Sequence, residues 1–251
     1  MSRFTGLLHV VTLLFIVCPA AADEGSGRKP DWGETDFRKF LPTLGHNFTC
    51  GLFTSDNLPP LFIGGVGTAL AYNYDQSISD AVAGDSEGFG EAGQIAGGPV
   101  VMSSLIGACV IAAPFTQNDR FRAFSFTLGQ AVIMDEVIYR SLKLAVDRTR
   151  PNGEDYSFPS GHAATTFMFA TVVHHYYGYK LSVPAYVFAG LVSWSRVELG
   201  KHYLSDVIFG ATLGYLTART ALRTQSNTAS RLSFFPYAGP GSGGVVFVLS
   251  M

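Results

Sequence analysis

Apolar residues form a series of blocks along the chain, and short polar stretches separate one block from the next. The block at 95–115 has no charged residue and is close to the ~20 residues that a membrane-spanning helix needs. In the other blocks apolar residues recur at helical spacing among many Gly, Ala, Ser and Thr residues, which is typical of closely packed helices. The pattern predicts an all-α fold, a bundle of about five or six apolar helices. The helices are expected at 61–72, 95–115, 121–146, 161–179, 181–194 and 203–222, with loops near 75–94, 147–158 and 196–202.

The two ends of the chain differ from this central region. Residues 1–22 combine a positive start at Arg3, an apolar centre and a run of small residues, which predicts a cleaved signal peptide. Residues 23–58 are polar and show no periodicity, so we expect a loosely structured leader before a helical domain at 59–230. Residues 231–251 hold two β-prone runs about a Gly/Pro turn, which predicts a small C-terminal β-hairpin.

Composition narrows the class of protein. Hydrophobic residues make up 47% of the chain and charged residues 14%, whereas ordinary globular domains carry about 25% charged residues. The formal net charge of −2 gives no electrostatic basis for nucleic-acid binding. An apolar, exported chain is expected in the cell envelope of a bacterium, either in the membrane with its working face outside the cytoplasm or as a soluble periplasmic protein.

Cysteine and histidine positions do not form a metal-binding motif. Without the signal peptide two cysteines are left, Cys50 and Cys109. Cys109 lies in an apolar run, where a small core residue is typical, and whether the two cysteines pair stays open. We therefore expect no metal and no cofactor.

Cationic and histidine side chains occur beside apolar blocks in three places. In the first, six residues separate Lys143 from Arg150 and Pro151; the second is Pro-Ser-Gly-His at 159–162, and the third lies at 195–206. Taken singly, basic residues at a helix end are explained by the helix dipole, and a Ser before a helix by capping. Together they place more positive charge beside apolar surface than local carboxylates neutralise, and a bound phosphate would neutralise it.

The clusters divide into phosphate-binding and reactive groups. Lys143, Arg150 and Arg196 are suited to hold phosphoryl oxygens. Ser160 and Gly161 add donors at the start of a predicted helix, which is an anion-binding position.

Two histidines complete the predicted reaction. His202 and Asp206 are four residues apart, so on a helix the carboxylate can accept a proton from one ring nitrogen and leave the other free to attack phosphorus. His162 is the expected general acid for the departing oxygen. Arg148 is expected at the surface, outside this site, and Asp135 has no predicted role.

The pattern Lys-x6-Arg-Pro, Pro-Ser-Gly-His and Ser-Arg-x5-His-x3-Asp resembles the type 2 phosphatidic acid phosphatase superfamily, which includes lipid phosphatases, class A acid phosphatases and vanadium haloperoxidases. The motifs match in residue type, order and spacing over roughly residues 121–220. The resemblance implies an all-α fold, metal-independent hydrolysis and a phosphohistidine intermediate. It also implies the roles given above, with His162 activating water in the second step.

The expected substrate is a phosphate monoester or diphosphate of a membrane lipid, because the chain is exported and its helices are apolar. The motifs contact only the phosphoryl group, so they do not separate one lipid from another. A soluble periplasmic acid phosphatase of broad specificity is the alternative, favoured by apolar blocks too short to cross a bilayer. A vanadate-dependent oxidase or a non-catalytic envelope protein is disfavoured, because every catalytic position is filled.

Overall fold

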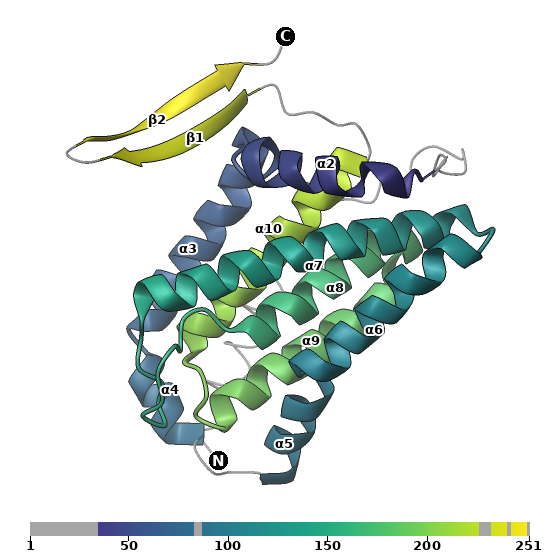
Figure 1. Ribbon diagram of the computed structural model, residues 1–251. Coiled ribbons are helices and arrows are strands. Elements are labelled where there is room, and N and C mark those ends of the chain that lie inside the picture. The colour runs from purple at the N-terminus through teal and green to yellow at the C-terminus, as the bar shows by residue number, and fades with distance from the viewer. Residues whose placement is uncertain (1–34, 83–86, 226–231, 240–241, 250–251) are drawn as a thin grey trace.

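The computed structural model describes residues 35–82, 87–225, 232–239 and 242–249 of the 251-residue chain. Helices form its central part, and a two-stranded hairpin follows them (Figure 1). The expected signal peptide at 1–22 lies outside the described residues.

Four long helices pack together at the centre of the molecule (Figure 1). They are α7 (Asp119–Val146), α8 (Gly161–Tyr177), α9 (Tyr179–Glu198) and α10 (Leu204–Gln225). α8 packs against the other three, and α10 also packs against α7. This arrangement confirms the predicted all-α bundle.

Shorter helices surround the central four. α3 (Leu58–Tyr72) packs along α10, α5 (Glu87–Ala96) along α9, and α6 (Pro99–Ala112) along α7, while α4 (Asp75–Val82) contacts α9 and α10. The loop expected near 75–94 is therefore replaced by α4 and α5. Their Gly- and Ser-containing sequences have low helix propensity, and packing on the long helices compensates for it.

The segment before α3 differs from the loosely structured leader expected at 23–58. Its described part forms helical turns, α2 (Phe40–His46) among them, which pack on α7 and α10. Fully buried Asn47 donates to the side-chain oxygen of Gln130 (3.3 Å) and accepts from the hydroxyl of Thr224 (2.5 Å). These long-range bonds order a segment whose local sequence has no periodicity. The other turns are Phe37–Lys39, Asn47–Gly51 and Ser55–Asn57.

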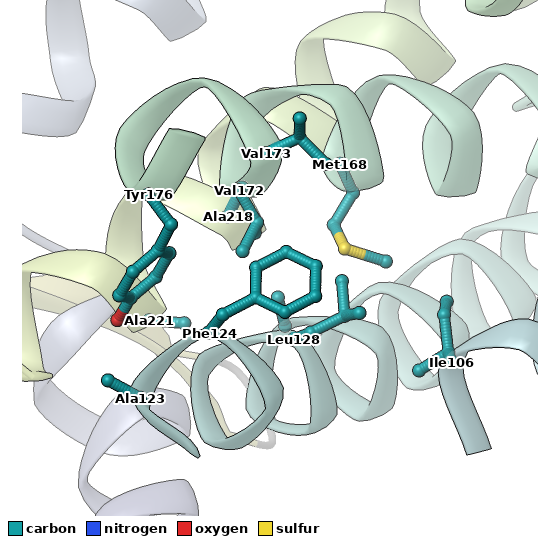
Figure 2. Close-up of a cluster of buried hydrophobic side chains, with 11 residues drawn as sticks. Ile106, Ala123, Phe124, Leu128, Met168, Val172, Val173, Tyr176, Ala218 and Ala221 are labelled. Carbon is teal, nitrogen blue, oxygen red and sulfur yellow. The ribbon is translucent and has the colours of Figure 1, made fainter. Parts of the chain in front are cut away.

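A buried apolar cluster joins α6, α7, α8 and α10 (Figure 2). Phe124 of α7 makes edge-on ring contacts with Phe169 and Tyr176 of α8, at centroid distances of 6.5 and 5.9 Å. Burial of these rings and of the aliphatic side chains around them holds the long helices in a fixed arrangement. The cluster consists of Ile106, Ala123, Phe124, Leu128, Ala131, Met168, Val172, Val173, Tyr176, Ala218 and Ala221.

α8 and α10 approach each other closely at two glycines. A Cβ atom at Gly210 would overlap the carbonyl oxygen of Ser160, and one at Gly214 would overlap that of Ala164. Only glycine permits this approach, because it has no side chain. The contact places the first turn of α8 directly against α10.

The C-terminal strands are β1 (Leu232–Gly239) and β2 (Ser242–Leu249). They pair antiparallel, with Leu232 opposite Leu249 and Gly239 opposite Ser242. This is the hairpin predicted for 231–251.

One stretch of the described chain is long and apolar enough to cross a membrane. It covers Gly90–Phe115, and its most apolar 18 residues have a mean hydropathy of 2.0 and are 24% buried in the protein. It includes the uncharged block at 95–115.

Candidate active site

A cavity of about 250 Å³ lies where the last turns of α7 and α9 meet the first turn of α8. Residues predicted from three separate motifs line it together. From the predicted set these are Lys143, Arg150, Gly161, His162, Arg196 and His202. The structure therefore gathers side chains that are up to 59 residues apart in sequence (202 − 143) around one small space.

The end of α7 sets the position of the first cations. Asp147 follows the helix in a left-handed conformation (φ 47°), which turns the chain back across the site. Lys143 donates to the carbonyl oxygen of Tyr156 in this returning loop (2.6 Å). Arg150 pairs with Glu154 (2.6 Å), so this carboxylate engages one of the guanidinium nitrogens.

The start of α8 presents Gly161 and His162 to the cavity. The hydroxyl of Ser160 accepts from the backbone N–H of Ala163 at 3.5 Å and caps the helix. Ser160 is fully buried and does not line the cavity, so its predicted direct contact with phosphate is not supported by its position. The ring nitrogen Nε2 of His162 is buried and has no hydrogen-bond partner among the described residues.

His202 lies in the loop before α10, not on the helix itself, so it does not share a helix face with Asp206 as expected. Its Nδ1 is 2.6 Å from the carbonyl oxygen of Ser157 and 3.9 Å from the nearest oxygen of Asp206. A carbonyl oxygen can only accept, so Nδ1 carries the proton and Nε2 keeps its lone pair.

Asp206 is connected to His202 through Ser157. One oxygen of its carboxylate accepts from the Ser157 hydroxyl (2.5 Å) and from the backbone N–H of Tyr203 (2.8 Å). Both donors to this carboxylate are linked to the imidazole of His202. The carbonyl oxygen of Ser157 contacts its Nδ1, and Tyr203 is the next residue in the chain. The orienting role of Asp206 stays a prediction, and in this geometry it would act through Ser157.

Several polar neighbours of the site carry no sequence signal. Arg148, expected at the surface, pairs with Asp206 (2.6 Å), and Ser157 has the contacts described above. Gln94 of α5 accepts from Arg196 (3.0 Å), so a helix outside all three motifs contacts a residue predicted to bind phosphate. Asp135 is fully buried and accepts from Thr165 (3.0 Å). The remaining cavity-lining residues are Gly97, Met102, Ser103, Glu136, Tyr139, Arg140 and Thr165.

Several cations lie close together at the cavity, and burial and their mutual repulsion lower the pKa of two of them. Burial, followed by the charge of Arg150, lowers the pKa of Lys143 to about 8. Burial and Arg150 also lower the pKa of Arg196, to about 10. Each cation is thus held in an environment that disfavours its charge, which an arriving anion would relieve.

The two histidines are neutral in this environment. Burial is the main cause that lowers the pKa of His162 to about 4, and the charges of Arg196, Lys143 and Arg150 add to it. Burial and the same three cations hold the pKa of His202 well below its ordinary value. A neutral imidazole is the nucleophilic form. Within the described chain, no group of three or more His, Cys, Asp or Glu side chains is placed to hold a metal ion.

The sequence profile of the PAP2 superfamily matches residues 152–229, which contain the second and third motifs and five of the cavity-lining residues. Residues 152–229 are therefore similar to a PAP2 superfamily domain. These five residues are Gly161, His162, Thr165, Arg196 and His202.

Relatives of this chain include named lipid phosphatases. Lipid A 1-phosphatase of Porphyromonas gingivalis is 41% identical over 78 residues, which is 30% of this chain and 18% of that protein. A probable lipid phosphate phosphatase beta of Arabidopsis thaliana is 27% identical over 151 residues, 45% of this chain and 71% of that protein. Phosphatidylglycerophosphatase B of Bacillus subtilis is 32% identical over 98 residues, 33% of this chain and 48% of that protein. The matches thus span less than two thirds of the first and third relatives.

Two solved structures share the fold. A transmembrane PAP2 type phosphatidylglycerolphosphate phosphatase from Bacillus subtilis superposes with a TM-score of 0.56 and 21% identity, over 68% of this chain and 96% of that one. LpxE from Aquifex aeolicus superposes with a TM-score of 0.50 and 23% identity, over 61% of this chain and 94% of that one. The PAP2 fold therefore extends beyond the 78 residues that the sequence profile matches (152 to 229).

Proposed function

We propose that this protein is a metal-independent phosphatase that hydrolyses a phosphate monoester or diphosphate of a membrane lipid through a phosphohistidine on His202. One observation carries the proposal: a single cavity of about 250 Å³ brings two neutral imidazoles together with the three predicted cations, while Arg140 in the same lining is paired with Glu136. Carboxylates do not balance these cations, because Lys143 and Arg196 bind neutral oxygens in the described structure and Arg150 shares Glu154 with Lys201.

Binding places the phosphoryl group among the cations. Lys143, Arg150 and Arg196 hold its oxygens, and the backbone N–H groups at the start of α8 add donors. The phosphate displaces Glu154 from Arg150, since a dianion competes for the same guanidinium. Charge neutralisation of this kind is the main contribution that a protein makes to phosphoryl transfer.

The first chemical step transfers the phosphoryl group to the enzyme. Nε2 of His202 attacks phosphorus, the bond from phosphorus to the leaving oxygen breaks, and His162 donates a proton to that oxygen. His162 is neutral before phosphate binds, and the charge of the bound phosphate raises its pKa so that it can carry this proton. In the second step neutral His162 takes a proton from water, and the oxygen of that water displaces His202 from phosphorus.

A lipid substrate is supported by the outer surface of the helices. Large apolar side chains are exposed on α3, α6 and α9, where a soluble protein would place polar residues. On α6 the exposed fractions reach 80% for Val100, 70% for Ile111 and 85% for Phe115 nearby. α6 also lines the cavity with Met102 and Ser103, so the site borders the candidate span. The names of the relatives point to the same substrate class.

We also propose that the active site faces the extracytoplasmic side of a bacterial envelope. The signal peptide expected at 1–22 supports export, and the helical domain expected at 59–230 would then fold outside the cytoplasmic leaflet or in the membrane. The hydrogen bonds of Asn47 join the segment at 35–58 to the helical domain.

The test is phosphate release by purified protein from a panel of phosphorylated lipids. The panel contains phosphatidate, phosphatidylglycerol phosphate, an isoprenoid diphosphate and lipid A, each assayed with and without EDTA. We expect at least one lipid to be hydrolysed, EDTA to have no effect, and His202→Ala to abolish release. Strict dependence on Mg²⁺, or turnover by His202→Ala near that of the wild type, would contradict the proposal.

A soluble periplasmic acid phosphatase is the second candidate, because the described chain has a single candidate span. Fractionation separates the two. We expect the protein in the membrane pellet until detergent is added, and release by a salt wash alone would favour the soluble enzyme.

A further inference from the structure

Arg148 bridges two buried carboxylates beside the site. One guanidinium nitrogen is 2.6 Å from Asp206 of α10, and another is 2.8 Å from Asp75 of α4. The Asp206 side chain is fully buried and that of Asp75 is 5% exposed, so both depend on Arg148 for charge neutralisation. Removing one partner of a buried ion pair leaves the other uncompensated.

The guanidinium of Arg148 also lies over two aromatic rings. It lies 4.2 Å from the ring centroid of Tyr203 and 5.0 Å from that of Tyr72. Asp75 in turn accepts from the backbone N–H (2.9 Å) and the hydroxyl of Ser205, at the start of α10. The ring contacts and the two ion pairs together fix the orientation of the planar guanidinium. A lysine ammonium cannot make the same set of contacts.

The bridge leads to the reactive imidazole. Asp206, fixed by Arg148, accepts from the hydroxyl of Ser157, and the carbonyl of Ser157 accepts from Nδ1 of His202. We infer that Arg148 is a positioning residue that, anchored on Asp75, holds the imidazole of His202 in line with the phosphorus atom. The inference rests on the proposed function, in which His202 is the nucleophile.

The position of Arg148 outside the cavity predicts that it affects the chemical step and not phosphate binding. Arg148 does not line the cavity, so it contributes nothing directly to holding phosphate oxygens. Inorganic phosphate needs only the cations of the cavity, whereas vanadate mimics the five-coordinate transition state and also bonds to the imidazole. Loss of alignment therefore weakens vanadate inhibition and leaves phosphate inhibition unchanged, because affinity for a transition-state mimic follows the rate of the chemical step.

The experiment compares Arg148→Gln, Arg148→Lys and Asp75→Asn with a matched control, Arg223→Gln. Arg223 also pairs with an aspartate, Asp56, and is similarly buried, but lies at the other end of α10. For Arg148→Gln we expect kcat to fall by about 10- to 100-fold, by analogy with the loss of outer partners that orient metal-bound histidines. The inhibition constant of vanadate should rise by about 10-fold or more, and KM and the inhibition constant of phosphate should change by less than about twofold.

The other variants keep the inference falsifiable if Arg148→Gln does not fold. Arg148→Lys should recover part of kcat, because an ammonium reaches one of the two carboxylates. Asp75→Asn should raise the ratio of the vanadate inhibition constant to the phosphate inhibition constant, as Arg148→Gln does, but by a smaller factor. Arg223→Gln should leave that ratio unchanged whatever it does to the melting temperature.

The outcomes distinguish this inference from the proposed function. If Arg148→Gln and Asp75→Asn keep the wild-type kcat and ratio while His202→Ala is inactive, Arg148 has no positioning role and the proposed function stands. If the vanadate and phosphate constants rise together, Arg148 supports the cavity as a whole and the inference is overturned. If His202→Ala is active, the proposed function itself fails.

Discussion

Two buried polar clusters lie at opposite ends of α10, and they differ in charge. Near the C-terminal end, Asn47, Gln130 and Thr224 exchange hydrogen bonds between neutral groups. Near the N-terminal end, Lys143, Arg196 and the neighbouring histidines surround a cavity. We refer to the first as the neutral cluster and to the second, with Arg150, as the cationic site.

The contrast shows how a structural polar group differs from a functional one. In the neutral cluster donors and acceptors satisfy one another, and no ligand is needed to complete it. In the cationic site burial and mutual repulsion lower the pKa of Lys143 to about 8, which is unfavourable in the absence of an anion. A fold retains such an arrangement when a ligand supplies the missing charge.

The largest effect that would sharpen this comparison is expected at His162. His162→Ala should lower turnover of a lipid phosphate by about 10²- to 10⁴-fold, the usual contribution of a general acid. With p-nitrophenyl phosphate, whose leaving group needs no proton, the loss should be much smaller. Steady-state kinetics on both substrates measure the difference, and equal losses would remove His162 from the acid role.

A smaller effect is expected from the neutral cluster, and it should fall on stability alone. Asn47→Ala removes the partner of buried Gln130 and of half-buried Thr224, which should lower the free energy of unfolding by about 1–3 kcal/mol. Denaturant unfolding in detergent measures this change. Because the cluster lies at the far end of α10, kcat per folded molecule should stay at the wild-type value. A loss of kcat would mean that the two clusters are coupled.

The smallest effect concerns the pH dependence of stability. The pKa of His162 is lowered to about 4 in the folded protein, so below its ordinary value of about 6.5 the unfolded chain binds more protons. Stability contributed by the neutral ring is therefore complete above pH ~6.5 and is lost as the pH falls from there toward pH ~4. Between pH 7 and pH 5, His162→Gln should lose less stability than the wild type, by on the order of 1–2 kcal/mol. Identical pH profiles for the two proteins would show that His162 is not neutral in the fold.

The sequence predicted the long helices and much of the cationic site, because both have local signals. Apolar periodicity marks α7 to α10, and motif spacing identifies Lys143, Arg150 and His202, which the structure brings to one cavity. Each of these residues was recognisable from its own neighbours in the chain.

Sequence patterns did not predict the contacts that arise between distant segments. Asp75 is 131 residues from Asp206 (206 − 75), and no local pattern shows that Arg148 joins them. The partner of His202 is the backbone carbonyl of Ser157, which has no side-chain signature. The order of the segment around Asn47 likewise depends on α7 and α10, so its own sequence indicated a loose leader.

The most direct test of the account is to trap the covalent intermediate. Protein mixed with a ³²P-labelled lipid phosphate is quenched in alkali, in which phosphohistidine survives, and the labelled peptide is mapped. We predict acid-labile label on His202, absent from His202→Ala and retained in Asn47→Ala. Label on another residue, or turnover of the lipid at the wild-type rate by His202→Ala, would contradict the account.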